Sequence, residues 1–130
     1  LCPPAPVVTR TATGDIDVDG YRVQAGTELV VGISALHRDP ALWDRPLDFD
    51  PDRFSPTNSV GRDRWQYLPF GGGPRSCIGD HFAMLEATLA LASIIRRAEI
   101  RSTTSTFPVA TPFTAVSAGP VWAVAHTLRP

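Results

Sequence analysis

Three consecutive glycines, Gly71, Gly72 and Gly73, followed by Pro74, interrupt the chain just before its longest apolar stretch. This run constrains the fold more than any other feature, because glycines let a backbone approach a flat or bulky group and adopt positive φ without a steric penalty. Cys77 follows, directly ahead of a segment with helical periodicity. The free N–H groups at the beginning of a helix stabilise a thiolate. The sequence therefore predicts a shaped loop that presents one sulfur.

The segment after Gly79 predicts a long helix of about 20 residues that is buried on most sides. Phe82, Leu85 and Leu89 share one helical face, and residues 87–95 are apolar almost all round. A helix with apolar residues on several faces has to pack against several partners. The rest of a 130-residue chain does not supply that much surface, so we expect residues 1–130 to be an incomplete part of one domain.

Short strands are predicted on both sides of this helix. Apolar and polar residues alternate over 16–23 around Asp19-Gly20, which is a strong hairpin signal. Residues 27–33 predict a buried strand, and 99–104 and 121–126 predict two further strands. The fold class is therefore mixed α+β.

Prolines and glycines break the pattern elsewhere in the first half of the chain. Three prolines make residues 1–9 an extended connector. Residues 34–38 predict a helical turn capped by Ser34, and a short helix is expected over 40–43. No periodicity is found from Asp44 to Pro69, and so long an ordered irregular segment is uncommon unless it has a function.

Composition excludes several classes of protein. Twelve basic residues against thirteen acidic ones give a net charge of −1, which argues against a nucleic-acid partner held by bulk charge. No run approaches the ~18 apolar residues of a membrane span. Two cysteines do not make a disulfide-dense scaffold.

Cys77 admits three interpretations from its surroundings alone: a nucleophile, a metal ligand or a buried structural cysteine. A nucleophile needs a general base, for which His37 and His81 are the candidates. A zinc site lacks a paired cysteine or histidine cluster. An axial thiolate to haem iron fits better, because the porphyrin supplies four of the other ligands and Arg75 can pair with a propionate.

Phe70–Gly79 resembles the Cys-loop of the cytochrome P-450 haem-thiolate monooxygenases at each constrained position. Other segments agree in the same order: Ala35–Pro40 with Trp43, and Phe49–Phe54, which resembles the Phe-x-Pro-Glu-Arg-Phe element of the family with Asp52 in place of Glu. Gly20-Tyr21, Ala25–Thr27 and the helix after Cys77 also fit. The resemblance covers nearly the whole chain. It implies the C-terminal part of a fold that is mainly helical in the parent, with small β-sheets, an irregular meander, the Cys-loop and the long buried helix.

The same resemblance implies where the chain lies in the parent enzyme. The family places a Glu-x-x-Arg helix directly before a Leu-x-Pro-Pro stretch like Leu1–Pro4. We therefore expect residues 1–130 to be the C-terminal portion of a single haem-binding domain, beginning just after that helix. Arg53 would engage that helix in the parent, and here it is expected to order the irregular segment.

Site roles carried over from the family centre on haem b. Cys77 would be the proximal thiolate and the iron ligand, and Arg10 and Arg75 would pair with haem propionates. Further haem contacts are implied at Phe70, Gly71, Ile78, Gly79 and Ala83. Substrate contacts are implied at Ala5, Val7 and Val8, and at a turn formed by Pro112, Phe113 and Thr114.

The implied activity is insertion of one atom of O2 into a small apolar organic substrate. The implied partner is an electron-donor redox protein, either a ferredoxin or a flavoprotein, and a cytoplasmic location is expected. An alternative from another class is a truncated, non-catalytic remnant of such an enzyme. A hydrolase that uses Cys77 with His37 is a third and weaker hypothesis.

Overall fold

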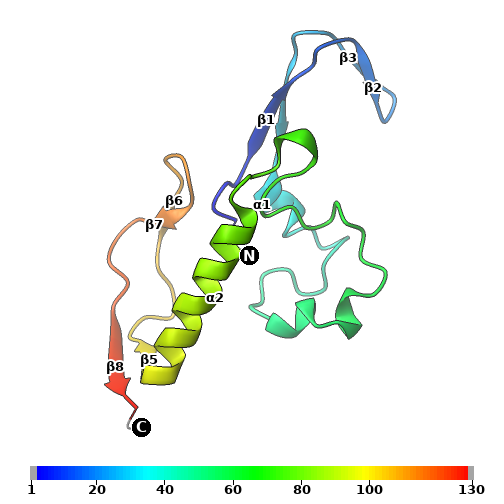
Figure 1. Ribbon diagram of the computed structural model, residues 1–130. Coiled ribbons are helices and arrows are strands. Elements are labelled where there is room, and N and C mark those ends of the chain that lie inside the picture. Colours follow the sequence, from blue (N-terminus) through cyan, green and yellow to red (C-terminus); the bar gives the residue numbers. More distant parts are fainter. Residues whose placement is uncertain (1–2, 129–130) are drawn as a thin grey trace. The chain divides into compact units, whose positions relative to one another are not determined.

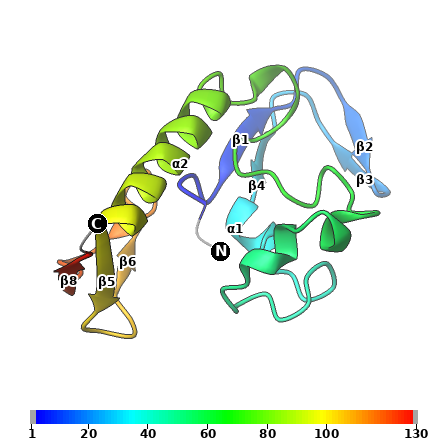
Figure 2. The same cartoon turned by 60° about the horizontal axis from the view of Figure 1, so that its bottom comes forward.

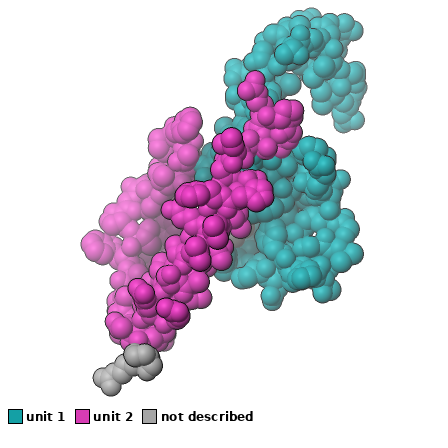
Figure 3. Space-filling view, viewed as in Figure 1, with its two compact units in different colours: residues 1–71 teal, residues 72–130 magenta. Residues whose placement is uncertain are grey.

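The computed structural model describes residues 3–128. The chain divides into two compact units, unit 1 with residues 1–71 and unit 2 with residues 72–130 (Figure 3). Leu1 and Cys2, part of the stretch expected to follow a Glu-x-x-Arg helix, lie outside the described residues. Both units contain short antiparallel strands, and each contains helical segments, in agreement with the α+β prediction.

Unit 1 contains two separate two-stranded antiparallel sheets (Figure 1). Strand β1, Val8–Thr11, pairs with β4, Glu28–Val31. Strand β2, Ile16–Val18, pairs with β3, Tyr21–Val23. The extended connector expected over residues 1–9 is therefore partly strand, because its last two residues belong to β1.

The hairpin predicted at Asp19-Gly20 is confirmed. These two residues connect Val18 to Tyr21 and have φ values of 51° and 81°. Positive φ at both central residues is the requirement of the tight turn that matches the twist of a β-ribbon. The Gly20 N–H also donates to Asp17 Oδ1 over 2.9 Å.

The predictions for the segment after this hairpin need correction. The strand expected over 27–33 was predicted to be buried, but β4 is largely exposed. It also ends at Val31, two residues earlier than expected. Ile33, only 2% exposed, instead begins helix α1, Ile33–Leu36. Ser34 does not cap this helix, because Gly32 occupies the cap position without a side-chain bond. A two-stranded sheet has no second layer here, so its strands stay exposed.

The irregular segment predicted at 44–69, hereafter the meander, is confirmed. Its regular structure is limited to two 3₁₀ turns, η1 at Pro51–Phe54 and η2 at Thr57–Ser59. The helix expected over 40–43 is a turn instead, in which the Asp39 carbonyl accepts from the N–H groups of Leu42 and Trp43.

Unit 2 contains the long helix α2 and the strands that follow it (Figure 2). The 3₁₀ turn η3, Gly73–Arg75, precedes α2, Asp80–Arg97. The strands that follow pair in two antiparallel ribbons: β5, Ala98–Ser102, with β8, Ala123–Thr127, and β6, Val109–Ala110, with β7, Val116–Ser117. The strands expected near 99–104 and 121–126 are confirmed, whereas β6 and β7 were not predicted in a segment broken by prolines.

Helix α2 has the expected length, but the prediction of a long buried helix is wrong for this chain. No residue of α2 is buried, and Phe82 is 72% exposed. Leu85 and Leu89 are also more than half exposed. The physical reason is that apolar residues on several faces can be covered only by several packing partners, and the described residues leave these faces open.

Residues 3–128 contain no helix that is both long and apolar enough to cross a membrane.

Candidate functional site

The Cys-loop, residues 70–79, takes its shape from its glycines. Gly71 and Gly73 have φ values of 72° and 70°, while Gly72 between them is extended. Positive φ is costly for residues with a Cβ atom. A Cβ atom at Gly71 or Gly73 would meet no atom within 4 Å. These two positions therefore require glycine for backbone conformation, and crowding within the chain plays no part.

Cys77 presents a free and exposed thiol in this loop. Ile78 beside it is fully exposed. Gly79 precedes α2, where its carbonyl accepts the first helical hydrogen bond, from the Ala83 N–H over 2.9 Å. A Cβ atom at Gly79 would lie 3.9 Å from Cys77 Sγ. The absence of a side chain at Gly79 therefore keeps space open directly beside the sulfur.

Arg75 supplies positive charge two residues before the sulfur. It is exposed at the end of η3, and it makes no hydrogen bond or ion pair with any other residue that the structure describes. Its guanidinium is available to an anionic group from outside the chain. Such a group would gain a charge-assisted hydrogen bond.

His81, one of the two candidate bases, is engaged by its neighbour. Asp80 Oδ1 accepts from the His81 backbone N–H over 2.6 Å and contacts His81 Nδ1. The hydrogen bond with the His81 side chain holds the pKa of Asp80 below its ordinary value, and the bond from the His81 backbone N–H lowers it further. Asp80 stands in the first turn of α2, where a carboxylate also suits the positive end of the helix dipole.

The residues around Cys77 fit a metal cofactor in which most of the ligands of the metal belong to the cofactor itself. Within residues 3–128, no cluster of three or more histidine, cysteine, aspartate or glutamate side chains is arranged to hold a metal ion. One sulfur, space beside it, an apolar neighbour and an uncommitted arginine match the needs of haem, which takes an axial thiolate and carries two propionates.

The remaining predicted site residues are divided between the two units. Phe70 and Gly71 end unit 1, whereas Arg75, Cys77, Ile78, Gly79 and Ala83 follow one another in unit 2. Arg10 lies on exposed β1 in unit 1, where its guanidinium donates to the Thr9 carbonyl over 2.7 Å. Ala5 and Val8 are partly buried in unit 1, and Val7 is exposed. Pro112, Phe113 and Thr114 lie in the bend that connects β6 to β7.

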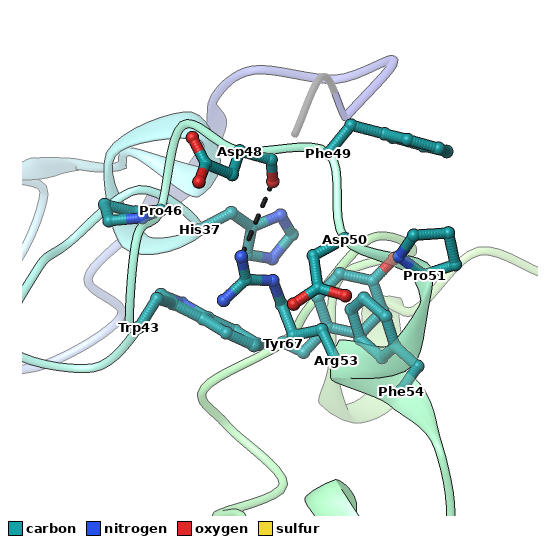
Figure 4. Close-up of a pocket in the computed structure, with 10 residues that line it drawn as sticks. All are labelled: His37, Trp43, Pro46, Asp48, Phe49, Asp50, Pro51, Arg53, Phe54 and Tyr67. Carbon is teal, nitrogen blue, oxygen red and sulfur yellow. Dashed lines mark hydrogen bonds between the residues drawn. The ribbon is translucent and has the colours of Figure 1, made fainter.

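Sequence reasoning missed an aromatic pocket of about 420 Å³ in unit 1 (Figure 4). Its walls come from the residue that caps the end of α1, the turn that follows, and the meander, and they comprise His37, Trp43, Pro46, Asp48, Phe49, Asp50, Pro51, Arg53, Phe54 and Tyr67. The prolines and aromatic residues of the meander were the available signal, but their convergence depends on contacts between residues far apart in the sequence.

Aromatic rings and arginines organise this pocket. The rings of Phe54 and Tyr67 have centroids 4.7 Å apart, and Trp43 lies near both. The Arg53 guanidinium donates to the backbone carbonyls of Asp44, Arg45 and Asp48, the last at 3.5 Å (dashed in Figure 4). The expectation that Arg53 orders the irregular segment is confirmed.

Arg62 contacts two of the aromatic residues that line this pocket. Its guanidinium lies 5.0 Å from the Trp43 ring centroid and 4.9 Å from that of Phe54, and it donates to the backbone carbonyls of Arg53 and Asn58. Cationic groups over aromatic faces stabilise such clusters. The meander is therefore held by its own arginines.

Sequence comparisons give relatives of one kind. The sequence model of the Cytochrome P450 family matches residues 1–118. Cyclooctatin synthase from Streptomyces melanosporofaciens is 46% identical over 121 residues, which cover 93% of this chain and 26% of that protein. Human Cytochrome P450 4V2 is 45% identical over 102 residues, covering 78% of this chain and 19% of that protein. The chain thus spans about a quarter or less of these relatives' length.

Solved structures agree with the sequence relatives. The heme domain of a cytochrome P450DA mutant superposes with a TM-score of 0.90 at 33% identity, covering 99% of this chain and 29% of that one. The retinoic acid-bound cyanobacterial CYP120A1 also gives a TM-score of 0.90, at 28% identity and with 98% and 30% coverage. With a family match over residues 1–118, the chain belongs to the cytochrome P450 family, whose members are monooxygenases that bind haem b.

Proposed function

We propose that this chain forms the haem-binding C-terminal part of a haem-thiolate monooxygenase, with Cys77 as the axial iron ligand. The observation that carries the proposal is the exposed, free thiol of Cys77 beside the open space at Gly79. Bound haem would supply the activation of O2, with one oxygen atom inserted into an organic substrate and the thiolate favouring O–O cleavage.

The chain's own residues would hold and shield the cofactor. Arg75 and Arg10 would bind the propionates through charge-assisted hydrogen bonds. Arg75 has no competing partner among residues 3–128, and Arg10 would have to exchange its bond to the adjacent Thr9 carbonyl. Apolar contact along the proximal face, which would exclude water from the sulfur, is assigned to Phe70, Gly71, Ile78, Gly79 and Ala83.

Two apolar segments would face the substrate. Ala5 and Val7 precede β1, which begins at Val8. The turn at Pro112, Phe113 and Thr114 carries a ring that is 91% exposed at Phe113. Apolar linings of this kind select apolar ligands. An electron donor of the ferredoxin or flavoprotein class would complete the cycle. A cytoplasmic location stays a prediction.

The alternative function, a non-catalytic remnant, is favoured by one observation. Helix α2 exposes Phe82 and other large apolar residues along its length. A chain that exposes such a surface gains little packing energy on folding. Cooperative unfolding of the isolated chain with haem bound would reject this alternative. Absence of both would support it.

The proposed function is tested most sharply in a chimera in which this chain replaces the matching C-terminal residues of the Streptomyces relative. We expect the reduced, carbon monoxide-bound chimera to give the red-shifted Soret band of a thiolate-ligated haem. Cys77→Ser should abolish that band. Cys2→Ser, the matched change at the other cysteine of the sequence, should leave it intact. The same band in the Cys77→Ser chimera would reject the assignment.

A further inference from the structure

Leu68 is bound through both of its backbone polar groups. Its N–H donates to His37 Nε2 over 2.9 Å. Its carbonyl accepts from the Gly71 N–H over 3.2 Å. The second bond closes a four-residue turn that has Pro69 at its second position and glycine at its fourth, as this kind of turn prefers. Phe70, the first residue of the Cys-loop, is the third residue of the turn.

His37 comes from the end of α1, 31 residues earlier in the sequence. Its side chain is buried, at 6% residue exposure, and its ring centroid lies 4.8 Å from that of Tyr67. Nε2 can accept a hydrogen bond only when it carries no proton. The contact with Leu68 therefore requires a neutral imidazole with its proton on Nδ1.

We propose that His37 is a positioning residue that anchors the turn Leu68–Gly71, and thereby the beginning of the Cys-loop, through its Nε2 lone pair. The anchor ties α1 to the backbone that carries Phe70 and leads into Gly72. Its relevance to haem rests on the proposed function. The anchor itself consists only of residues of unit 1.

The anchor is sensitive to pH because a protonated imidazole has no acceptor. Burial holds the pKa of His37 below its ordinary value of 6.5. In the window below 6.5 the unfolded chain then binds more protons than the folded one, so the contribution of the anchor to stability falls as pH falls. Above 6.5 the ring is neutral and the contribution is complete.

Other charged and titratable groups share the pocket around His37. Tyr67 stacks against the imidazole, and Asp48, Asp50 and Arg53 line the same cavity (Figure 4). The Arg53 guanidinium opposes a second positive charge there, and the two carboxylates favour one. Desolvation is nevertheless the leading cause of the lowered pKa of His37.

The test is amide hydrogen exchange of the full chain, read at Leu68 as a protection factor at pH about 7.5 and about 4.5. Wild-type protection should fall about tenfold on acidification, as expected for loss of one partly buried hydrogen bond. His37→Phe keeps an aromatic ring beside Tyr67 but has no acceptor, so protection should be low at both pH values. His37→Gln restores an acceptor that does not titrate, so protection should persist at both.

His126→Phe and His126→Gln are the matched controls, since His126 lies exposed on β8, and neither should change exchange at Leu68. Through-hydrogen-bond NMR coupling between the Leu68 amide nitrogen and His37 Nε2 would give direct support. Protection that does not change with pH in the wild type, or failure of His37→Gln to differ from His37→Phe, would overturn the proposal. No step of this test involves haem, so its failure leaves the assignment of Cys77 standing.

Discussion

The meander, which contains four prolines, and the Cys-loop, which contains four glycines, are both irregular, yet their functional side chains are placed in opposite ways. In the meander, Arg53 and Arg62 use their guanidinium groups to bind backbone carbonyls of the same segment. In the Cys-loop, Arg75 makes no such bond, and Cys77 and Ile78 are exposed. The arginines of the meander thus form hydrogen bonds within their own segment, whereas the Cys-loop exposes a guanidinium group, a thiol and an apolar side chain to solvent.

This difference separates a scaffold from the surface that we propose binds haem. An irregular backbone must find partners for its carbonyl and N–H groups, and the meander finds them in its own arginines. In the Cys-loop the bonds are made by the backbone itself, from the Gly71 N–H to the Leu68 carbonyl, from the Ser76 N–H to the Gly73 carbonyl and from the Ala83 N–H to the Gly79 carbonyl. Its side chains are thereby left free for a ligand.

The largest expected effect concerns the sulfur. In the Cys2→Ser background, the exposed Cys77 should be alkylated in the native chain about as fast as in urea, because the thiol is accessible. Haem loading of the chimera should block the reaction almost completely. Mass spectrometry of the modified protein gives both rates. If haem loading left the alkylation rate of Cys77 unchanged, the Cys-loop could not be the haem-binding surface that distinguishes it from the meander.

Replacing an arginine by alanine should lower stability in the meander but not in the Cys-loop. Arg53→Ala removes donors from three backbone carbonyls and should lower the free energy of unfolding of unit 1 by about 2 kcal/mol. Arg75→Ala, the matched change in the Cys-loop, should shift stability by less than about 0.5 kcal/mol. Urea denaturation measures both. Equal losses would contradict the contrast.

Glycine substitutions should have the same effect in both regions where the glycine has a positive φ. Gly61 in the meander and Gly71 in the Cys-loop both have positive φ and open space where a Cβ atom would lie. Alanine at either should cost about 1 kcal/mol of stability. Gly79→Ala, at φ −96°, should cost little stability and instead weaken haem binding by the chimera, because its Cβ would lie beside Cys77 Sγ. Haem titration and denaturation would separate these effects, and a large stability loss at Gly79 would be the contrary result.

Acid should give the smallest effect, and the two regions should respond at different pH. The pocket beside the meander should lose stability through His37 below pH 6.5, and the helix after the Cys-loop through Asp80 below pH 3.8. Because the folded pKa of Asp80 is lowered, this carboxylate stabilises the beginning of α2 at higher pH and loses that contribution as pH falls below 3.8. His81→Gln should raise the pKa of Asp80 toward its ordinary value, since the His81 side chain is the leading cause of the shift. Carboxyl carbon NMR titration measures it. An unaltered titration of Asp80 would contradict the pairing.

Local sequence signals predicted the local structure well. The hairpin at Asp19-Gly20 and the length of α2 follow from turn chemistry and helical periodicity, which act over a few residues. Cys77 was identified as the candidate ligand from the glycines before it and the helix after it. Its contacts with haem stay predictions.

Features that depend on distant contacts were not predicted. The sequence indicated that α2 is apolar, but burial depends on partners that the described residues do not provide. The bond between His37 and Leu68 joins positions 31 residues apart, and no periodicity reports such a pair. A packing role was expected for Trp43, but its ring neighbours Phe54 and Tyr67 were not predicted, because they lie 11 and 24 residues away in the sequence.

X-ray absorption at the iron edge of the haem-loaded chimera tests the central claim most directly, because it detects the atoms bound to iron. The account predicts one sulfur neighbour of iron in the wild-type and Cys2→Ser chimeras and none in Cys77→Ser. A sulfur neighbour that persists in Cys77→Ser, or its absence from the wild type, would contradict the account.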